Sequence, residues 1–159
     1  MINKIIESVT DKILKELLTV KYSKTEIALD YVMRYSGRWY IWGGDDPTGF
    51  DCSGLALEYL KARGSVKINE DYTAQQLAEK YQRMAFPRRG ALVYYGKDEK
   101  HITHVQICLS EQLALGSNGG TSKIKTAADA QRYDAFINVR PIHYRSDIVM
   151  YNYPYELLQ

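Results

Sequence analysis

The chain has 159 residues, of which 45% are apolar and 25% charged, and its net charge is +2. This length suits one domain with its own core, and the composition is that of an ordinary globular protein. So small a net charge argues against nucleic acid or a strongly anionic membrane as a partner. No apolar run approaches the roughly 20 residues that cross a bilayer, so membrane insertion is not expected.

The first 22 residues are expected to form a helical extension in front of a domain that spans residues 23–159. An apolar stripe with helical spacing consists of Ile6, Val9, Ile13 and Leu17, flanked by Ile5, Leu14 and Leu18. Packing against the domain body or a second copy is the simpler expectation for this stripe. Membrane binding is the lesser one, because the polar face is not strongly basic. The segment lacks a signal-peptide pattern, so synthesis in the cytoplasm is expected.

Three further helices are predicted from capping and stop signals. Ser23 and Glu26 have capping-box spacing and open a helix that Gly37 ends. Residues 52–63 have an apolar helical face, and Gly64 is a natural stop. Residues 73–81 are expected to form a short helix.

The pattern changes after Pro87 to short apolar or alternating runs separated by glycine and polar clusters. These runs are GALVYYG, THVQICLS, LALGS and AFINVRPI. They are typical of strands joined by turns. Helices followed by strands predict an α+β fold, with the helices packed on one face of an antiparallel sheet.

Cys52 lies where the glycine-rich acidic stretch YIWGGDDPTGFDCSG, residues 40–54, gives way to a predicted helix. The dipole and unpaired N–H groups of a helix N-terminus favour a thiolate. Lowering a thiol pKa of about 8.5 by about three units requires roughly 4 kcal/mol. A helix terminus supplies about 0.3–1 kcal/mol, and about 2 in the best geometry. A nearby imidazolium is therefore required.

His104 is the best candidate for that imidazolium. It opens a predicted strand in which His104, Gln106 and Cys108 face one way, and a thiolate–imidazolium pair with Cys52 is expected. A buried cysteine and an unrelated surface histidine are the simpler alternative from the pattern alone. Zinc held by Cys52 and the histidines is disfavoured because no ligand pair has suitable spacing, so neither a metal nor a cofactor is expected.

The stretch YIWGGDDPTGFDCSGL, followed by GALVYYG and ITHVQICL, resembles the NlpC/p60 family of papain-like cysteine peptidases. The resemblance covers roughly residues 25–141, and its Asp-Cys-Ser-Gly core is specific. It implies a papain-like fold with the nucleophile at a helix N-terminus. It also implies cleavage of peptidoglycan stem peptides, often between γ-D-glutamate and the diamino acid.

Position by position, Cys52 resembles the nucleophile and His104 the general base. Tyr40 matches an aromatic residue whose hydroxyl helps to polarise the scissile carbonyl. Asp51 and Ser53 match positions that hold the free amine of a stem peptide, and a carboxylate and a hydroxyl suit an ammonium group. A helix N-cap is the alternative role of Asp51.

Three positions depart from the family pattern. The orienting residue about a dozen places after the base would be Gly116, which has no side chain for the task. Asn118 shares its strand face and is a candidate orienting amide, although NGG is also an ordinary turn sequence. The usual glycine after His-Val is Gln106, expected to be an extra substrate or oxyanion contact. The strand motif Gly90–Val93 lacks its common aspartate.

These patterns predict a cysteine amidohydrolase acting on peptidoglycan stem peptides. A silent peptide- or partner-binding domain of the same fold, and a cysteine acyltransferase or amidase on another substrate, are the alternatives. The acidic loop and the segment RPIHYRSDIVMYNYP are similar to bacteriophage-encoded members. A phage particle, a lysis system or a secretion machine would then deliver the enzyme to the wall, with the N-terminal helix serving for phage-particle attachment or self-association.

Overall fold

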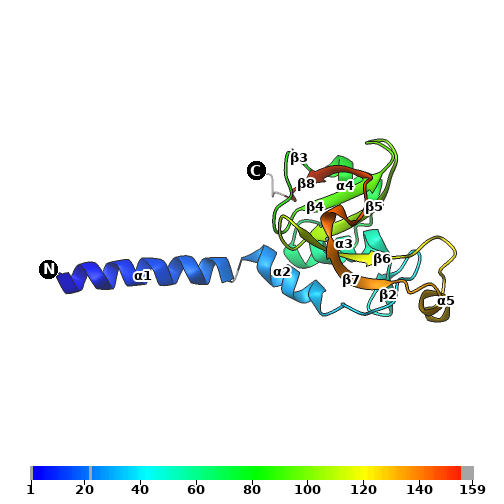
Figure 1. The fold of residues 1–159 in the computed structure, drawn as a ribbon. Coiled ribbons are helices and arrows are strands. Elements are labelled where there is room, and N and C mark those ends of the chain that lie inside the picture. Colours follow the sequence, from blue (N-terminus) through cyan, green and yellow to red (C-terminus); the bar gives the residue numbers. More distant parts are fainter. Residues whose placement is uncertain (1, 22, 155–159) are drawn as a thin grey trace.

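The computed structural model describes residues 2–21 and 23–154, and for residues 2–5, 7 and 17–21 it describes the backbone alone. One sheet dominates the fold (Figure 1). Its strands are β3 (Arg83–Met84), β4 (Leu92–Gly96), β5 (Ile102–Cys108), β6 (Leu113–Asn118), β7 (Phe136–Pro141) and β8 (Ile148–Asn152). They pair antiparallel in the order β3-β8-β4-β5-β6-β7.

Most capping signals of the sequence are confirmed, but the helix that Ser23 opens ends at Met33, four residues before the predicted stop at Gly37. The helices are α1 (Ile2–Lys21), α2 (Lys24–Met33), α3 (Cys52–Arg63), α4 (Ala74–Lys80), α5 (Ala127–Arg132) and the 3₁₀ turn η1 (Ile142–Tyr144). The Ser23 hydroxyl accepts a hydrogen bond from the Glu26 N–H at the start of α2, and Thr73 forms a complete capping box with Gln76 on α4. Gly64 ends α3 in the left-handed conformation with φ of 79°.

The main core lies between α2, α3 and α4 and one face of the sheet. From the helices it takes Leu29, Leu55 and Leu60, and from the strands Val105 and Ile107. The opposite sheet face carries a smaller cluster, built from residues such as Val93, Tyr95 and Cys108, which η1 covers with Ile142. The predicted α+β class is confirmed.

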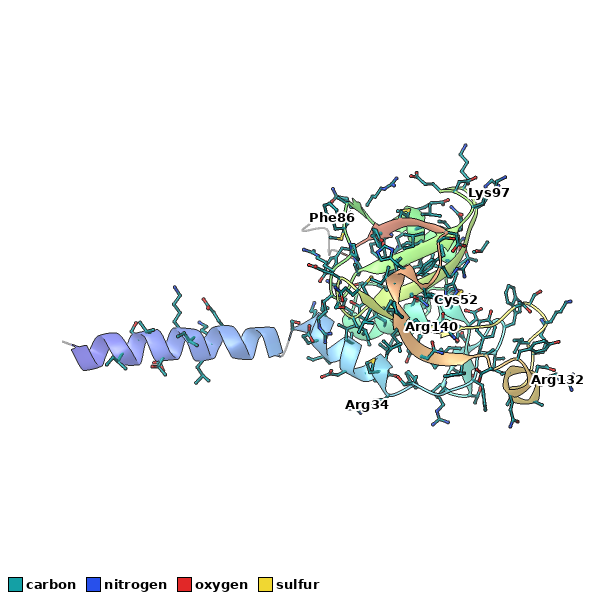
Figure 2. All side chains as sticks on the ribbon, viewed as in Figure 1. Arg34, Cys52, Phe86, Lys97, Arg132 and Arg140 are labelled. Carbon is teal, nitrogen blue, oxygen red and sulfur yellow. The ribbon has the colours of Figure 1, made fainter. Side chains whose placement is uncertain are left out.

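Helix α1 extends away from the rest of the described chain (Figures 1 and 2). Its described apolar side chains Ile6, Val9, Ile13 and Leu14 are all more than half exposed. The predicted stripe members Ile5, Leu17 and Leu18 lie outside the side chains that the structure describes. Packing of this stripe on the domain body is therefore not observed at the four described positions.

Several elements were not predicted from the sequence. Helix α5 and the two-stranded hairpin of β1 (Asp45–Asp46) and β2 (Gly49–Phe50) are too short to show a periodic pattern. Strand β8 was not predicted either, and it lies between β3 and β4 in the sheet. No helix among the described residues is long and apolar enough to span a membrane.

Candidate active site

Cys52 is the first residue of α3, and Asp51 fixes the loop that leads into it. One carboxylate oxygen of Asp51 accepts from the Gly54 N–H at 2.7 Å and from the Ser53 hydroxyl at 2.9 Å. The other accepts from the Gly43 N–H at 3.0 Å. Asp51 is thus the helix N-cap, and it also ties the glycine-rich loop to the nucleophile. The predicted amine-binding role of Asp51 and Ser53 stays a prediction.

The sulfur of Cys52 faces the first half of β5. The backbone N–H groups of Val105, Ser53 and Cys52 itself act on it and lower its pKa. Burial has the larger, opposite effect and, together with the charge of Asp51, raises the pKa of the thiol to about 11.

His104 lies on β5, is 9% exposed, and has its Nε2 atom 3.1 Å from Oδ1 of Asn118. Strands β5 and β6 pair Ile107 with Leu115 and Cys108 with Ala114, and continuing that register brings position 104 opposite position 118. Burial lowers the pKa of His104 to about 4, and the Arg145 guanidinium adds to this effect. The bond to Asn118 and the charge of Asp147 oppose it.

Burial therefore favours the neutral thiol and the neutral imidazole, and the expected thiolate–imidazolium pair is not the form that it stabilises. The helix N-terminus is too weak to overcome this effect. In this environment, transfer of the thiol proton to His104 would accompany attack on a substrate rather than precede it.

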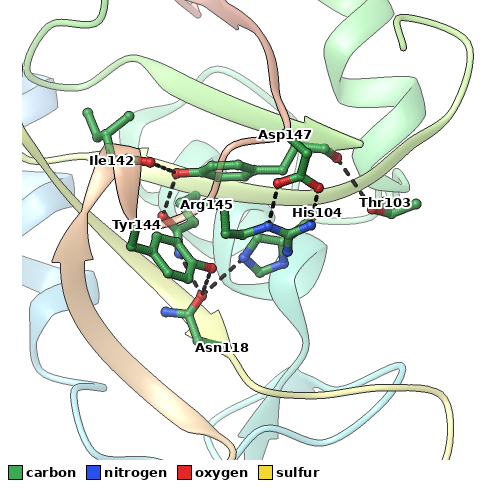
Figure 3. Close-up of polar contacts among 9 residues, drawn as sticks. Thr103, His104, Asn118, Ile142, Tyr144, Arg145 and Asp147 are labelled. Carbon is green, nitrogen blue, oxygen red and sulfur yellow. Dashed lines mark hydrogen bonds and ion pairs between the residues drawn. The ribbon is translucent and has the colours of Figure 1, made fainter. Parts of the chain in front are cut away.

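Figure 3 shows His104 and the Tyr144 hydroxyl at Oδ1 of Asn118, and the bonds of the amide nitrogen determine how the amide is oriented. Its Nδ2 atom donates to the Gly116 carbonyl at 2.9 Å and to Oδ1 of Asn138 at 2.8 Å. Because a backbone carbonyl only accepts, the amide nitrogen must face Gly116 and Oδ1 must face His104. Nε2 of His104 then carries the hydrogen, and Nδ1 is left with the lone pair that a base needs.

Tyr40 lies in the loop after α2 and is 3% exposed. Burial raises the pKa of its hydroxyl, and the nearby charge of Asp51 adds to this effect, so the hydroxyl remains a neutral donor. Gly120 packs directly on the tyrosine ring, since a Cβ atom there would lie 2.1 Å from Cε1. The NGG sequence, residues 118–120, is thus part of the site rather than only a turn.

A cavity of about 520 Å³ brings Tyr40, Asp51, Cys52, Ser53 and His104 together. Its far wall, which the sequence did not predict, is formed by residues 71–76 at the start of α4 and by Ile102 and Thr103. The carboxylates among the lining residues are Asp45, Asp51 and Asp71. A cavity with this charge favours a cationic group on its ligand.

Gln106 is not a cavity residue. It is 1% exposed, and its amide bonds to Asn118 and to Tyr95 behind His104. The expected substrate or oxyanion contact is therefore wrong. Strand alternation places Gln106 on the same face as His104, but the space over Gly116 lets its side chain lie along the sheet instead of reaching the cavity.

The other titratable candidates lie apart from the cavity. Cys108 is fully buried in the smaller core cluster, and His101 is exposed and bonded to Asp98. His143 is an exposed residue of η1. Among the described residues, no group of three His, Cys, Asp or Glu side chains is arranged to hold a metal ion.

Comparison with known proteins agrees with this geometry. The family model "NlpC/P60 family" matches residues 37–140, which include Tyr40, Cys52, His104 and Asn118. The chain belongs to the NlpC/P60 family. Its curated relatives include the bifunctional muramidase/DL-endopeptidase CwlT of Bacillus subtilis, which is 33% identical over 96 residues, 58% of this chain and 29% of CwlT.

A second relative is the murein DD-endopeptidase MepH of Escherichia coli, 43% identical over 54 residues, 33% of this chain and 19% of MepH. The chain thus matches less than a third of either relative's length. Among solved structures, the NlpC/p60 domain of the peptidoglycan hydrolase SagA superposes with a TM-score of 0.59 and 19% identity, covering 80% of this chain and 97% of that domain. This likeness supports the predicted papain-like fold.

Proposed function

We propose that this chain is a cysteine endopeptidase that hydrolyses amide bonds in the stem peptides of bacterial peptidoglycan. The observation that carries the proposal is the position of Cys52 at the start of α3, in one cavity with His104, whose Nε2 atom is held by Asn118. The names of CwlT and MepH support a peptidoglycan substrate and an endopeptidase reaction.

The reaction follows from the assigned tautomer of His104. Sγ of Cys52 attacks the amide carbonyl while its proton passes to Nδ1 of His104, and the new oxyanion accepts from the Cys52 N–H and the Tyr40 hydroxyl. His104 next protonates the amine as the C–N bond breaks, leaving a thioester. Water then attacks the thioester, gives a proton to His104, and releases the acid and the thiol.

The proposed bond joins γ-D-glutamate to the diamino acid, as the family resemblance implies. The three cavity carboxylates support a substrate with a free amine. Asp51 and Ser53 are the proposed binding residues for this amine. The Asp51 oxygen that already accepts two hydrogen bonds within the protein can still accept another.

Digestion of purified peptidoglycan with mass analysis of the fragments tests the proposal. The wild type should release fragments that begin with the diamino acid, and Cys52→Ala and His104→Ala should release none. His101→Ala is the matched control, because His101 is exposed and outside the cavity lining. Equal fragments from the wild type and Cys52→Ala would refute the proposal. Cleavage by the wild type at a bond between two D-amino acids would reject only the proposed bond.

A binding domain without activity is the second candidate, and the burial that keeps Cys52 and His104 neutral favours it. Peptidoglycan binding and fragment release, measured on the same samples, separate the two. Peptidoglycan binding with no released fragments would favour the binding domain. Acyl transfer to another substrate would release no wall fragments and would still require Cys52.

Residues 1–22 are proposed to be an extension and residues 23–159 the domain. The exposed apolar side chains of α1 support self-association or attachment of the extension to another body. A phage origin and delivery to the wall by a phage particle, lysis system or secretion machine stay predictions from the sequence.

A further inference from the structure

Gln106 and Gly116, two of the positions that depart from the family pattern, face each other across β5 and β6. A Cβ atom on Gly116 would lie 2.6 Å from Cγ and 2.7 Å from Nε2 of Gln106. The side chain of Gln106 therefore occupies the place that any side chain at position 116 would take. The two departures are therefore linked, because the side chain added at position 106 takes the space left by the missing side chain at position 116.

The amide of Gln106 reaches the group that holds His104. Its Nε2 atom donates to Oδ1 of Asn118 at 2.6 Å, which is shorter than the 3.1 Å bond from His104 to the same oxygen. The Tyr95 hydroxyl lies 3.1 Å from Oε1 of Gln106 and 2.9 Å from the Ile142 carbonyl. The one hydrogen of the Tyr95 hydroxyl is shared between these two acceptors, so the bond to Asn118 is the main contact of the Gln106 amide.

A rotation of the Asn118 amide by half a turn would reverse the roles at His104. Nδ2 would then face Nε2 of His104, which would have to become an acceptor and leave Nδ1 protonated. In that orientation Nδ2 of Asn118 would also face Nε2 of Gln106, and two donors would meet at the position of the shortest bond in the cluster. Gln106 opposes the rotation that would disable the base.

We propose that Gln106 is a positioning residue that fixes the Asn118 amide and, through it, holds His104 with the hydrogen on Nε2 and the lone pair on Nδ1. Gly116 is required because it leaves the space that Gln106 fills. The Tyr144 hydroxyl, 3.2 Å from Oδ1 of Asn118, supports the same orientation from η1 (Figure 3). The effect on rate rests on the proposed function, but the tautomer of His104 does not.

Four variants and a control test the proposal. Gln106→Met keeps the length of the side chain and removes its donor, and Gly116→Ala displaces Gln106 from the neighbouring strand. Gln106→Ala removes the amide, and its combination with Gly116→Ala removes the clash as well. Tyr151→Phe is the control, because it removes a tyrosine hydroxyl from β8, which pairs with β3 and β4 and not with the Asn118 strand β6.

The readouts are the ¹⁵N signals of the His104 ring, the exchange rate of its Nε2 hydrogen with water, and kcat and KM on peptidoglycan. In the wild type we expect one tautomer with a slowly exchanging Nε2 hydrogen. Gln106→Met and Gly116→Ala should each speed that exchange about 10-fold and lower kcat about 10- to 100-fold with KM unchanged. The double variant Gln106→Ala with Gly116→Ala should have the same kcat and exchange rate as Gln106→Ala alone, because both substitutions act through one contact.

Folding is monitored in the same samples by alkylation of Cys108, which is fully buried in the native protein. If Cys108 becomes reactive in Gln106→Met, that variant is not folded, and the result for Gly116→Ala is then used to test the proposal. Unchanged His104 tautomer and exchange in a folded variant would overturn the proposal. If the variants alter the exchange of the His104 Nε2 hydrogen but the wild type cleaves no peptidoglycan, the positioning role is supported and the proposed function is rejected.

Discussion

Replacing Gly120 by alanine should disable the site through Tyr40. The added methyl carbon would lie 2.1 Å from Cε1, 2.2 Å from Cδ1 and 2.3 Å from Cγ of the tyrosine ring. Carbon atoms pack at about 3.5 Å or more, so the ring must move by about 1.4 Å. Gly120 does not have a positive φ, so the expected effect comes from this contact rather than from backbone strain.

The magnitude follows from the position of the hydroxyl. Tyr40 is 3% exposed and packs with Ile124 and Ala135, so its ring has little free space to move into. A displacement of about 1 Å can cost about 100-fold in rate, equivalent to about 2.7 kcal/mol in the barrier. Overpacking should also lower the free energy of unfolding by about 1–3 kcal/mol.

The assay is kcat for fragment release from peptidoglycan, with thermal unfolding measured in parallel. Gly120→Ala and Tyr40→Phe should each lower kcat about 100-fold, and the double variant should lie close to the single variants because both remove one hydroxyl contact. Ser122→Ala, an exposed substitution in the same loop, is the control. Full activity of folded Gly120→Ala, or losses that multiply in the double variant, would refute the reasoning.

Three further outcomes are expected. Asn118→Ala should lower kcat about 10²- to 10⁴-fold with little change in KM, and an unchanged kcat would exclude Asn118 as the orienting group. A chain of residues 23–159 should keep the thermal midpoint and activity of the full chain, and loss of either would reject the boundary. Arg89 forms a two-point ion pair with Glu26 and lowers the pKa of that carboxyl. The stabilisation from this ion pair is therefore present above the unfolded pKa of Glu26, about 4.3, and is lost as pH falls through the lower folded pKa. In denaturant titrations, Glu26→Gln should be less stable than wild type by at most about 1 kcal/mol at pH 7 and equally stable at low pH.

The parts of the site that sequence reasoning predicted depend on signals close together in the chain. Asp51, Cys52 and Gly54 fall in one turn, so the cap and the helix start could be inferred without knowing the fold. Gly64 ended the same helix for an equally local reason. The fold class followed from where helical periodicity gave way to alternating strands.

The parts that were missed depend on packing between distant segments. Strand β8 has no turn signal that distinguishes it from a tail, and its place beside β4 is set by the sheet. Residues 71–76 have no catalytic side chain to mark them, yet they form a wall of the cavity because α4 packs beside β5. Gln106 was predicted to contact the substrate because the sequence indicated its strand face but not that Gly116 on β6 would lie opposite it.

The orienting group for His104 shows why a count of residues after the base is an incomplete guide. The turn bonds Leu109 N–H to the Leu113 carbonyl, and the register that follows pairs 107 with 115 and 108 with 114. The same register sets position 116 opposite 106 and position 118 opposite 104. A group twelve residues after His104 therefore faces Gln106, and Asn118, fourteen residues after it, faces the base itself. Because the side chain of Gln106 fills the space that a side chain at 116 would need, Asn118 is the β6 residue that is left to hold the histidine.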